Sequence, residues 1–289
     1  MSNKTEAVKG PSKFDWKKFI SNNTAIIAFI VLFILAAIFR GQTFLKPSNL
    51  IGVLRNNSII GIVSLGMTLV IIVGGIDLSV GAVMAMAGMV ASYLSLAGLP
   101  FGVCLAAGLA AGAVSGVVNG VILANTTLPP FIVTYAVQSI LRGMVYVITG
   151  AGTIRLTSKV FLEFGGGSVG PIPFPVIYMV VIIALSILLL SRSKLGRHMY
   201  AIGGNPKAAR FAGINTKRIK ILIYTLSGVC AALAGLVLTS RNSSMQPAVG
   251  NGAEMDAIAA VVLGGTSMAG GRGAIAGTIL GAFIIGFIN

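Results

Sequence analysis

Residues 175–191 read PVIYMVVIIALSILLLS, an apolar stretch without a single charged side chain. A helix needs about 20 mostly apolar residues to cross the hydrocarbon layer of a bilayer, where only helices and closed barrels satisfy the backbone. Other stretches have the same character, and none alternates as a barrel strand would. The predicted spans, about nine, are 24–39, 58–74, 78–97, 101–124, 131–149, 175–191, 219–240, 256–270 and 274–289. The sequence therefore predicts an all-α membrane protein, a polytopic helical bundle.

The composition supports this class. Of 289 residues, 56% are hydrophobic and only 9% are charged, although the formal net charge is +15. The basic side chains lie between the apolar stretches and not along an aromatic-rich groove, so we interpret the charge as a sign of topology in a lipid bilayer. No nucleic-acid partner is expected. Cys104 and Cys230 each lie in an apolar stretch without a second ligand nearby, which predicts neither a disulfide nor a metal site.

Charge also predicts the orientation. The N-terminal segment, residues 1–23, is lysine-rich and is followed by no cleavage pattern, so we expect it to stay in the cytoplasm of a multi-pass protein of the cell membrane. Counting spans from there places loop 150–174 outside and loop 192–218 inside. The inner loop is the most basic one, with Arg192, Lys194, Arg197, Lys207, Arg210, Lys217 and Arg218. Residues 24–289 are thus predicted to form a single transmembrane domain.

Two stretches suggest an internal repeat. IDLSVGAVMAMAGM (76–89) and MDAIAAVVLGGTSM (255–268) each begin next to an aspartate, Asp77 or Asp256, and reach a methionine twelve residues later. A span with glycine at every fourth position follows each stretch. Because the two copies are five spans apart, they would cross in opposite directions, as in a 5+5 inverted repeat. Chance similarity between apolar sequences is the alternative. The repeat predicts a tenth span after residue 289.

A short helix is predicted within the basic loop. In GGNPKAARFAG (203–213), Asn205 suits the N-cap and Pro206 the first helical position, and Gly213 suits the stop. The residues between are Lys207, Ala208, Ala209, Arg210 and Phe211. Two interpretations remain open: a helix that fits a groove of a partner, or an interfacial helix held by anionic lipid headgroups.

Polar residues within the apolar stretches are candidates for a translocation path. Asp77 follows a Gly-Gly pair at the junction of two stretches, where it either lines a path or serves as the N-terminal charge of the next helix. Asn119, Asn125, Thr126 and Gln138 either line a path for hydroxylated solutes or bond between helices. Arg142 is interpreted as reaching outward to the membrane surface.

No catalytic residues, metal site or cofactor are predicted. The sequence contains no GxxxxGK[ST] motif, and the glycine-rich stretch 264–273 lacks its lysine. With one histidine and six scattered acids, a hydrolytic site is not expected. Energy for any transport would come from another subunit.

Three blocks resemble the permease subunits of ribose-type ABC importers. They are GGIDLSVGAVMAMAG, LPPFIVTYAVQSILRG, and the stretch from LGRHMYAIGGNPKAARFAGI through to GAFIIGFIN. The resemblance implies a permease dimer, cytoplasmic ABC ATPase subunits docked on 205–213 as a coupling helix, and an extracytoplasmic sugar-binding protein docked on 150–174 with 241–255. It implies import of a monosaccharide, ribose first, by alternating access. An ion- or proton-coupled carrier is the alternative, and only Asp77 is a candidate for its coupling site.

Overall fold

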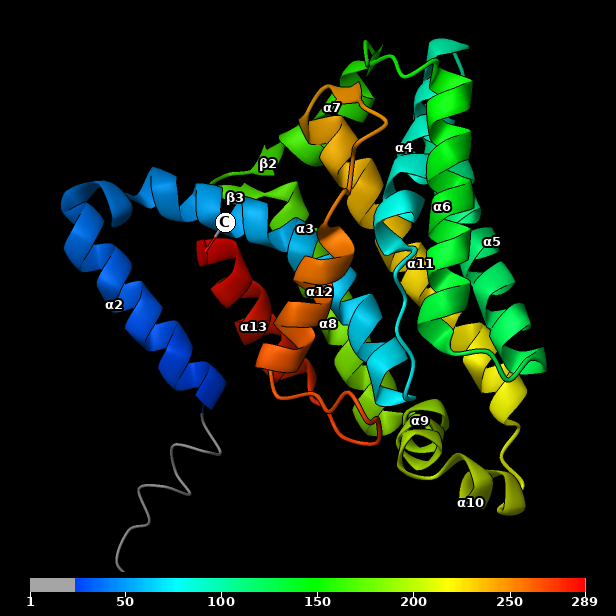
Figure 1. Cartoon of the computed structure of the whole chain (residues 1–289). Coiled ribbons are helices and arrows are strands. Elements are labelled where there is room, and N and C mark those ends of the chain that lie inside the picture. Colours follow the sequence, from blue (N-terminus) through cyan, green and yellow to red (C-terminus); the bar gives the residue numbers. More distant parts are fainter. Residues whose placement is uncertain (1–23, 289) are drawn as a thin grey trace, which may run out of the picture.

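The computed structural model describes residues 24–288, and most of them are helical. Residues 1–23, predicted to be cytoplasmic, and Asn289 lie outside the described residues. The helices are α2 (Thr24–Phe44), α3 (Pro47–Ile72), α4 (Val80–Leu96), α5 (Phe101–Asn125), α6 (Pro130–Thr149), α7 (Lys159–Gly166), α8 (Phe174–Arg192), α9 (Lys194–Gly204), α10 (Pro206–Phe211), α11 (Thr216–Arg241), α12 (Ala253–Leu263) and α13 (Ile275–Ile288) (Figure 1). The short strands are β1 (Ile154–Arg155), β2 (Ser168–Val169), β3 (Ile172–Pro173) and β4 (Ser244–Met245).

Long apolar helices dominate the described residues, as the sequence predicted. The five that are long and apolar enough to cross a membrane are α3, α5, α6, α8 and α11. Shorter apolar helices cover Ala25–Phe39 of α2, α4 and α13. Helices α7 and α9–α10 lie at opposite ends of the bundle, the α7 end and the α9–α10 end (Figure 1).

Two predicted boundaries need correction. Helix α3 begins at Pro47, well before residue 58, because a proline at the first turn starts it and the polar side chains from Arg55 to Asn57 fit within it. The predicted span 256–270 is wrong as a continuous helix. Helix α12 ends at Leu263, before a turn in which Gly265 has φ +85°. Its 11 residues reach about 16 Å, roughly half of the hydrocarbon layer.

Helix α11 lies at the centre, packed against α3, α4 and α5. The glycines of α5 explain how closely it approaches α11. A Cβ atom on Gly116 would lie 2.2 Å from the carbonyl oxygen of Tyr224, and one on Gly112 would lie 2.4 Å from that of Gly228. Small residues permit such packing where lipid removes the hydrophobic drive between helices. The glycines at every fourth position of α5 therefore serve close helix packing.

Two predicted outer segments meet at the α7 end. Strand β1, within 150–174, pairs antiparallel with β4, within 241–255, so that Ile154 faces Met245 and Arg155 faces Ser244. Helix α7 and the β2–β3 hairpin complete this end. The structure therefore joins two stretches that lie about 90 residues apart along the chain.

Irregular backbone leads into both stretches of the suggested repeat. Residues 73–79 precede α4, and residues 246–252 precede α12. The aspartates differ in position, however. Asp77 precedes α4, whereas Asp256 lies in the first turn of α12. The 5+5 inverted repeat and the tenth span stay predictions.

The glycine contact between α5 and α11 can be tested by overpacking. We expect Gly116→Ala to lower the free energy of unfolding by about 1–3 kcal/mol, because the new methyl group meets backbone atoms that cannot move aside. Gly102→Ala, on the same helix with no atom within 4 Å of its Cβ position, is the control and should leave stability unchanged. Thermal unfolding of the purified variants in detergent measures both; equal stability of the two would contradict the packing described.

Candidate functional site

The first turn of α4, just after the irregular segment 73–79, meets the irregular segment 246–252 inside the helical bundle. A Cβ atom on Gly81 would lie 2.2 Å from the carbonyl oxygen of Gly250, and one on Gly250 would lie 2.6 Å from that of Gly81. The N-terminal ends of α4 and α12 therefore touch backbone to backbone. In membrane proteins, discontinuous helices of this kind mark the places where solutes are bound and moved. The meeting point is the candidate site.

Side chains satisfy the backbone of the first segment. The hydroxyl of Thr134 accepts a hydrogen bond from the Leu78 amide at 3.1 Å and lies 3.3 Å from the carbonyl oxygen of Ile76. The Tyr224 hydroxyl donates to the same carbonyl at 3.4 Å. Irregular backbone is tolerated at membrane depth only when protein or water supplies such partners. Helices α6 and α11 thus hold this segment in place.

Asp77 is buried at the end of this segment. Its Oδ1 atom accepts hydrogen bonds from the amide of Ser79 at 3.0 Å and from the Ser79 hydroxyl at 2.6 Å, and its Oδ2 atom accepts one from Ser227 at 3.0 Å. Asn119 donates to the Ser79 hydroxyl at 2.8 Å, so two predicted path residues share one network. Both carboxylate oxygens accept hydrogen bonds, and the Asp77 residue is only 1% exposed. That geometry agrees with the interpretation of Asp77 as an N-terminal charge of α4.

Arg142 and Gln138 satisfy the second segment. The Nη1 atom of Arg142 donates to the carbonyl oxygens of Pro247 at 2.6 Å and Val249 at 2.7 Å. The interpretation that Arg142 reaches outward to the membrane surface is therefore wrong, because its guanidinium group bonds to a buried stretch of backbone. Gln138 donates to Oε1 of Glu254 at 3.3 Å, at the start of α12.

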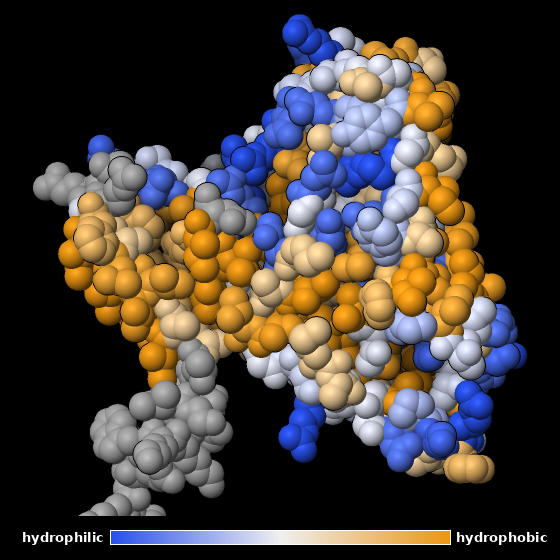
Figure 2. Space-filling view, in the orientation of Figure 1, coloured by the Kyte–Doolittle hydropathy of each residue, from blue (hydrophilic) through white to orange (hydrophobic). Residues whose placement is uncertain are grey.

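One face of α6 serves both segments. Thr134, Gln138 and Arg142 are spaced four residues apart, which places them one above the other on the helix. We call these three residues the α6 polar stripe. Figure 2 shows hydrophilic residues gathered between α12 and α6 toward the α7 end. The stripe therefore places polar groups beside both irregular segments.

The remaining predicted path residues lie elsewhere. Asn125 and Thr126 are exposed at the end of α5, where the Asn125 side chain accepts a hydrogen bond from Lys217 at 3.0 Å. The Thr126 hydroxyl donates to the carbonyl oxygen of Ile122, within its own helix. The structure does not bring these two residues to the α6 polar stripe. They lie at the end of the bundle where α11 begins.

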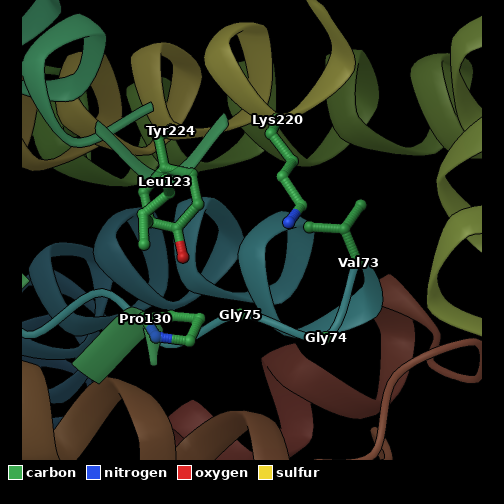
Figure 3. A pocket seen from close by; sticks show the side chains of 7 residues that line it. All are labelled: Val73, Gly74, Gly75, Leu123, Pro130, Lys220 and Tyr224. Atoms are coloured by element: carbon green, nitrogen blue, oxygen red, sulfur yellow. The ribbon is translucent and has the colours of Figure 1, made fainter. Parts of the chain in front are cut away.

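A small cavity lies beside the first segment (Figure 3). Its volume is about 30 Å³, and it is lined by Val73, Gly74, Gly75, Leu123, Pro130, Lys220 and Tyr224. A cavity of this size holds a water molecule but no sugar. Gly75 is required there, because a Cβ atom would lie 2.4 Å from the Tyr224 hydroxyl. The cavity is therefore not a solute site itself, and the Gly74–Gly75 turn is closely packed beside it.

The short helix predicted in the basic loop is confirmed as α10. The Asn205 side chain accepts a hydrogen bond from the Ala208 amide at 3.0 Å, Pro206 occupies the first position, and Gly213 has φ +82° after the last turn. Ala209 is buried against the bundle, whereas Phe211 is 93% exposed. The remaining residues of the predicted segment, Lys207 and Arg210, line a groove beside Phe211.

Long apolar helices, two irregular segments inside the bundle and a polar helix face beside them are the features of a polytopic membrane permease. The chain belongs to the family described as the permease component of branched-chain amino acid transport systems, which matches residues 49–289. It is 45% identical to the ribose import permease RbsC of Bacillus subtilis (strain 168), over 90% of this chain and 82% of that protein.

Other relatives carry similar names. The chain is 41% identical to RbsC of Escherichia coli (strain K12), over 99% of this chain and 89% of that protein. It is 39% identical to the D-allose transport system permease AlsC of the same strain, over 90% and 81%. No solved structure matches the chain.

The network around Asp77 predicts a stability effect. We expect Ser227→Ala to lower the free energy of unfolding by about 1.5–3 kcal/mol, because it removes a donor from a buried carboxylate. Ser139→Ala is the control, since the Ser139 hydroxyl is exposed and bonds only to the Tyr135 carbonyl of its own helix. Unfolding in detergent, followed by loss of the monodisperse peak, distinguishes them; a Ser227→Ala variant as stable as the control would refute the network.

Proposed function

We propose that this chain is the membrane-spanning subunit of an ATP-driven importer that carries ribose, or a closely related monosaccharide, across the cytoplasmic membrane. The observation that carries the proposal is its similarity, over most of its length, to permeases named for ribose and allose. The chain itself does not hydrolyse ATP, since its sequence has no phosphate-binding loop.

The chemistry beside the broken helices suits a sugar better than a branched-chain amino acid. The α6 polar stripe offers a hydroxyl, an amide and a guanidinium group, which together pair with hydroxylated solutes. A branched-chain amino acid would also need an apolar pocket for its side chain. Arg142 donates to two backbone carbonyls through Nη1, whereas its Nη2 atom and Oε2 of Glu254 have no hydrogen-bond partner among the described residues; a sugar hydroxyl, both donor and acceptor, can pair with either.

We place the translocation path between the α6 polar stripe and α12. Gln138 lies along it, bonded to Glu254 at the start of α12. Asp77 and Asn119 support the start of α4 through Ser79, and Asn125 and Thr126 lie at the end of the bundle where α11 begins. Alternating access then consists of rearranging the irregular segments 73–79 and 246–252, whose hydrogen bonds to side chains can be exchanged at lower cost than those of a regular helix. Gly-lined contacts between the segments allow them to slide.

Partners are assigned by the two ends of the bundle. The α9–α10 end carries the basic residues of 192–218, which favours a cytoplasmic position, and α10 is the helix that docks on the ABC ATPase subunit. The α7 end, with the β1–β4 pair, then faces outward and receives the sugar-binding protein. A second copy of the permease completes the transporter, and the N-terminus lies in the cytoplasm.

Uptake decides between the proposed substrates. Cells that lack their own ribose permease and carry this chain, with its ATPase and binding protein, should accumulate labelled ribose. Excess unlabelled ribose should compete and leucine should not. Uptake of leucine but not of ribose would overturn the sugar assignment. Loss of uptake with a protonophore at constant ATP would favour the ion- or proton-coupled carrier instead.

Docking of the ATPase subunit on α10 predicts that shortening Phe211 weakens this complex. Phe211→Ala should reduce co-purification of the ATPase subunit about tenfold, because truncating an exposed aromatic anchor at an interface costs 1–2 kcal/mol or more. Val169→Ala, an exposed apolar residue at the α7 end, is the matched control and should leave co-purification unchanged. Equal recovery of the ATPase with both variants would contradict docking on α10.

A further inference from the structure

The end of α9 touches the turn after α3 and the turn after α12. A Cβ atom on Gly203 would lie 1.9 Å from the carbonyl oxygen of Ile72, the last residue of α3, and 2.4 Å from the amide nitrogen of Gly271. That amide donates to the same Ile72 carbonyl at 2.9 Å. Three backbones therefore meet at one point: the end of α3, the end of α9 and the turn between α12 and α13.

A second contact, three residues earlier along α9, holds the same turn between α12 and α13. The hydroxyl of Tyr200 donates to the carbonyl oxygen of Gly273 at 2.8 Å. Within the turn, Gly270 and Gly271 have φ of +84° and +72°, in the left-handed region that glycine adopts without strain. We call Ile72, Tyr200, Gly203, Gly271 and Gly273 the α9 joint.

Helix α9 is anchored in the core and not loosely attached to it. Its Met199 and Ile202 side chains are fully buried, in a cluster that also contains Ile72, Val73 and Ile275. These are the residues that end α3 and begin α13. A displacement of α9 must therefore move both neighbours or break this packing, because close-packed interiors transmit strain.

One residue links α9 to α10. The backbone amide of Asn205 donates to the Ala201 carbonyl at 3.0 Å and so ends α9. The side chain of the same residue caps α10. No flexible linker separates the two helices. Force applied to α10 reaches α9 directly, since the same residue completes the hydrogen bonding of both.

We propose that the α9 joint passes the movement of α10 to both broken helices at once. The turn after α3 and the turn after α12 would then open and close together when the ATPase moves α10. The inference rests on the proposed function, because it needs an ATPase at α10. Gly203 is a positioning residue: it touches no solute and acts through the backbones of Ile72 and Gly271.

Two adjacent glycines give a matched test. Gly203→Ala places a methyl group into the joint, whereas Gly204→Ala meets no atom within 4 Å. In the transporter assembled with its ATPase and binding protein in vesicles, we expect Gly203→Ala to lower sugar uptake per ATP hydrolysed about tenfold, within the usual range of coupling between sites. ATP hydrolysis itself should stay within twofold. Gly204→Ala should match the unmodified chain in both.

Tyr200→Phe keeps the ring and removes one hydrogen bond of the α9 joint. We therefore expect a smaller drop in sugar uptake per ATP hydrolysed. A merely structural defect would lower hydrolysis and uptake together by reducing the amount of assembled transporter. An unchanged ratio in Gly203→Ala would overturn the proposal. Uptake by the unmodified chain is measured in the same experiment, so a failure of the proposed function is seen separately.

A distance measurement keeps the proposal testable if Gly203→Ala does not assemble. Spin labels at Met268, exposed in the turn after α12, and at Val114, exposed on α5, report movement of the turn. ATP binding should change the distance between them in the unmodified and Gly204→Ala backgrounds, and less in Tyr200→Phe. No change on ATP binding in a transporter that still takes up sugar would refute coupling through the joint.

Discussion

The structure depends on one constraint: backbone polar groups inside a membrane need partners within the protein. Two segments, 73–79 and 246–252, leave the helical hydrogen-bonding pattern inside the bundle, and both find their partners on α6. Thr134 serves the first segment and Arg142 the second. A polar helix face in an apolar protein is costly unless it meets such groups. The positions of α4, α6 and α12 follow from this requirement.

The same constraint makes movement possible. A regular helix can rearrange only by breaking its own ladder of hydrogen bonds, whereas a segment held by side chains can exchange one partner for another. Backbone contacts between glycines, at Gly81 with Gly250 and at Gly203 with Gly271, leave no side chains to interlock. The contact of Gly81 with Gly250 lies beside the α6 polar stripe, and the contact of Gly203 with Gly271 lies next to α10. In the proposed mechanism, these short stretches of backbone connect the docking of an ATPase at α10 with the movement of the solute.

Local patterns were predicted from the sequence and distant contacts were not. Helix α10 was predicted residue by residue because capping by Asn205 and termination at Gly213 involve only neighbours in the chain. The end of α12 was missed because the apolar stretch continues past Leu263, and hydropathy does not register a change of backbone direction at glycine. The roles of Arg142 and Glu254 were also missed, since their partners lie more than 100 residues away along the chain. Arg142 within a predicted span and Glu254 just before another were the available signal.

The proposed mechanism requires that α10 face the cytoplasm and the β2–β3 hairpin face outward. Cysteine labelling measures this most directly, with Phe211→Cys and Val169→Cys as single exposed positions at opposite ends of the bundle. In intact cells that express the chain without an ATPase subunit, a membrane-impermeant maleimide should label Val169→Cys. It should label Phe211→Cys only after the membrane is permeabilised. Labelling of Phe211→Cys from outside, with Val169→Cys protected, would contradict the orientation on which the proposed mechanism depends.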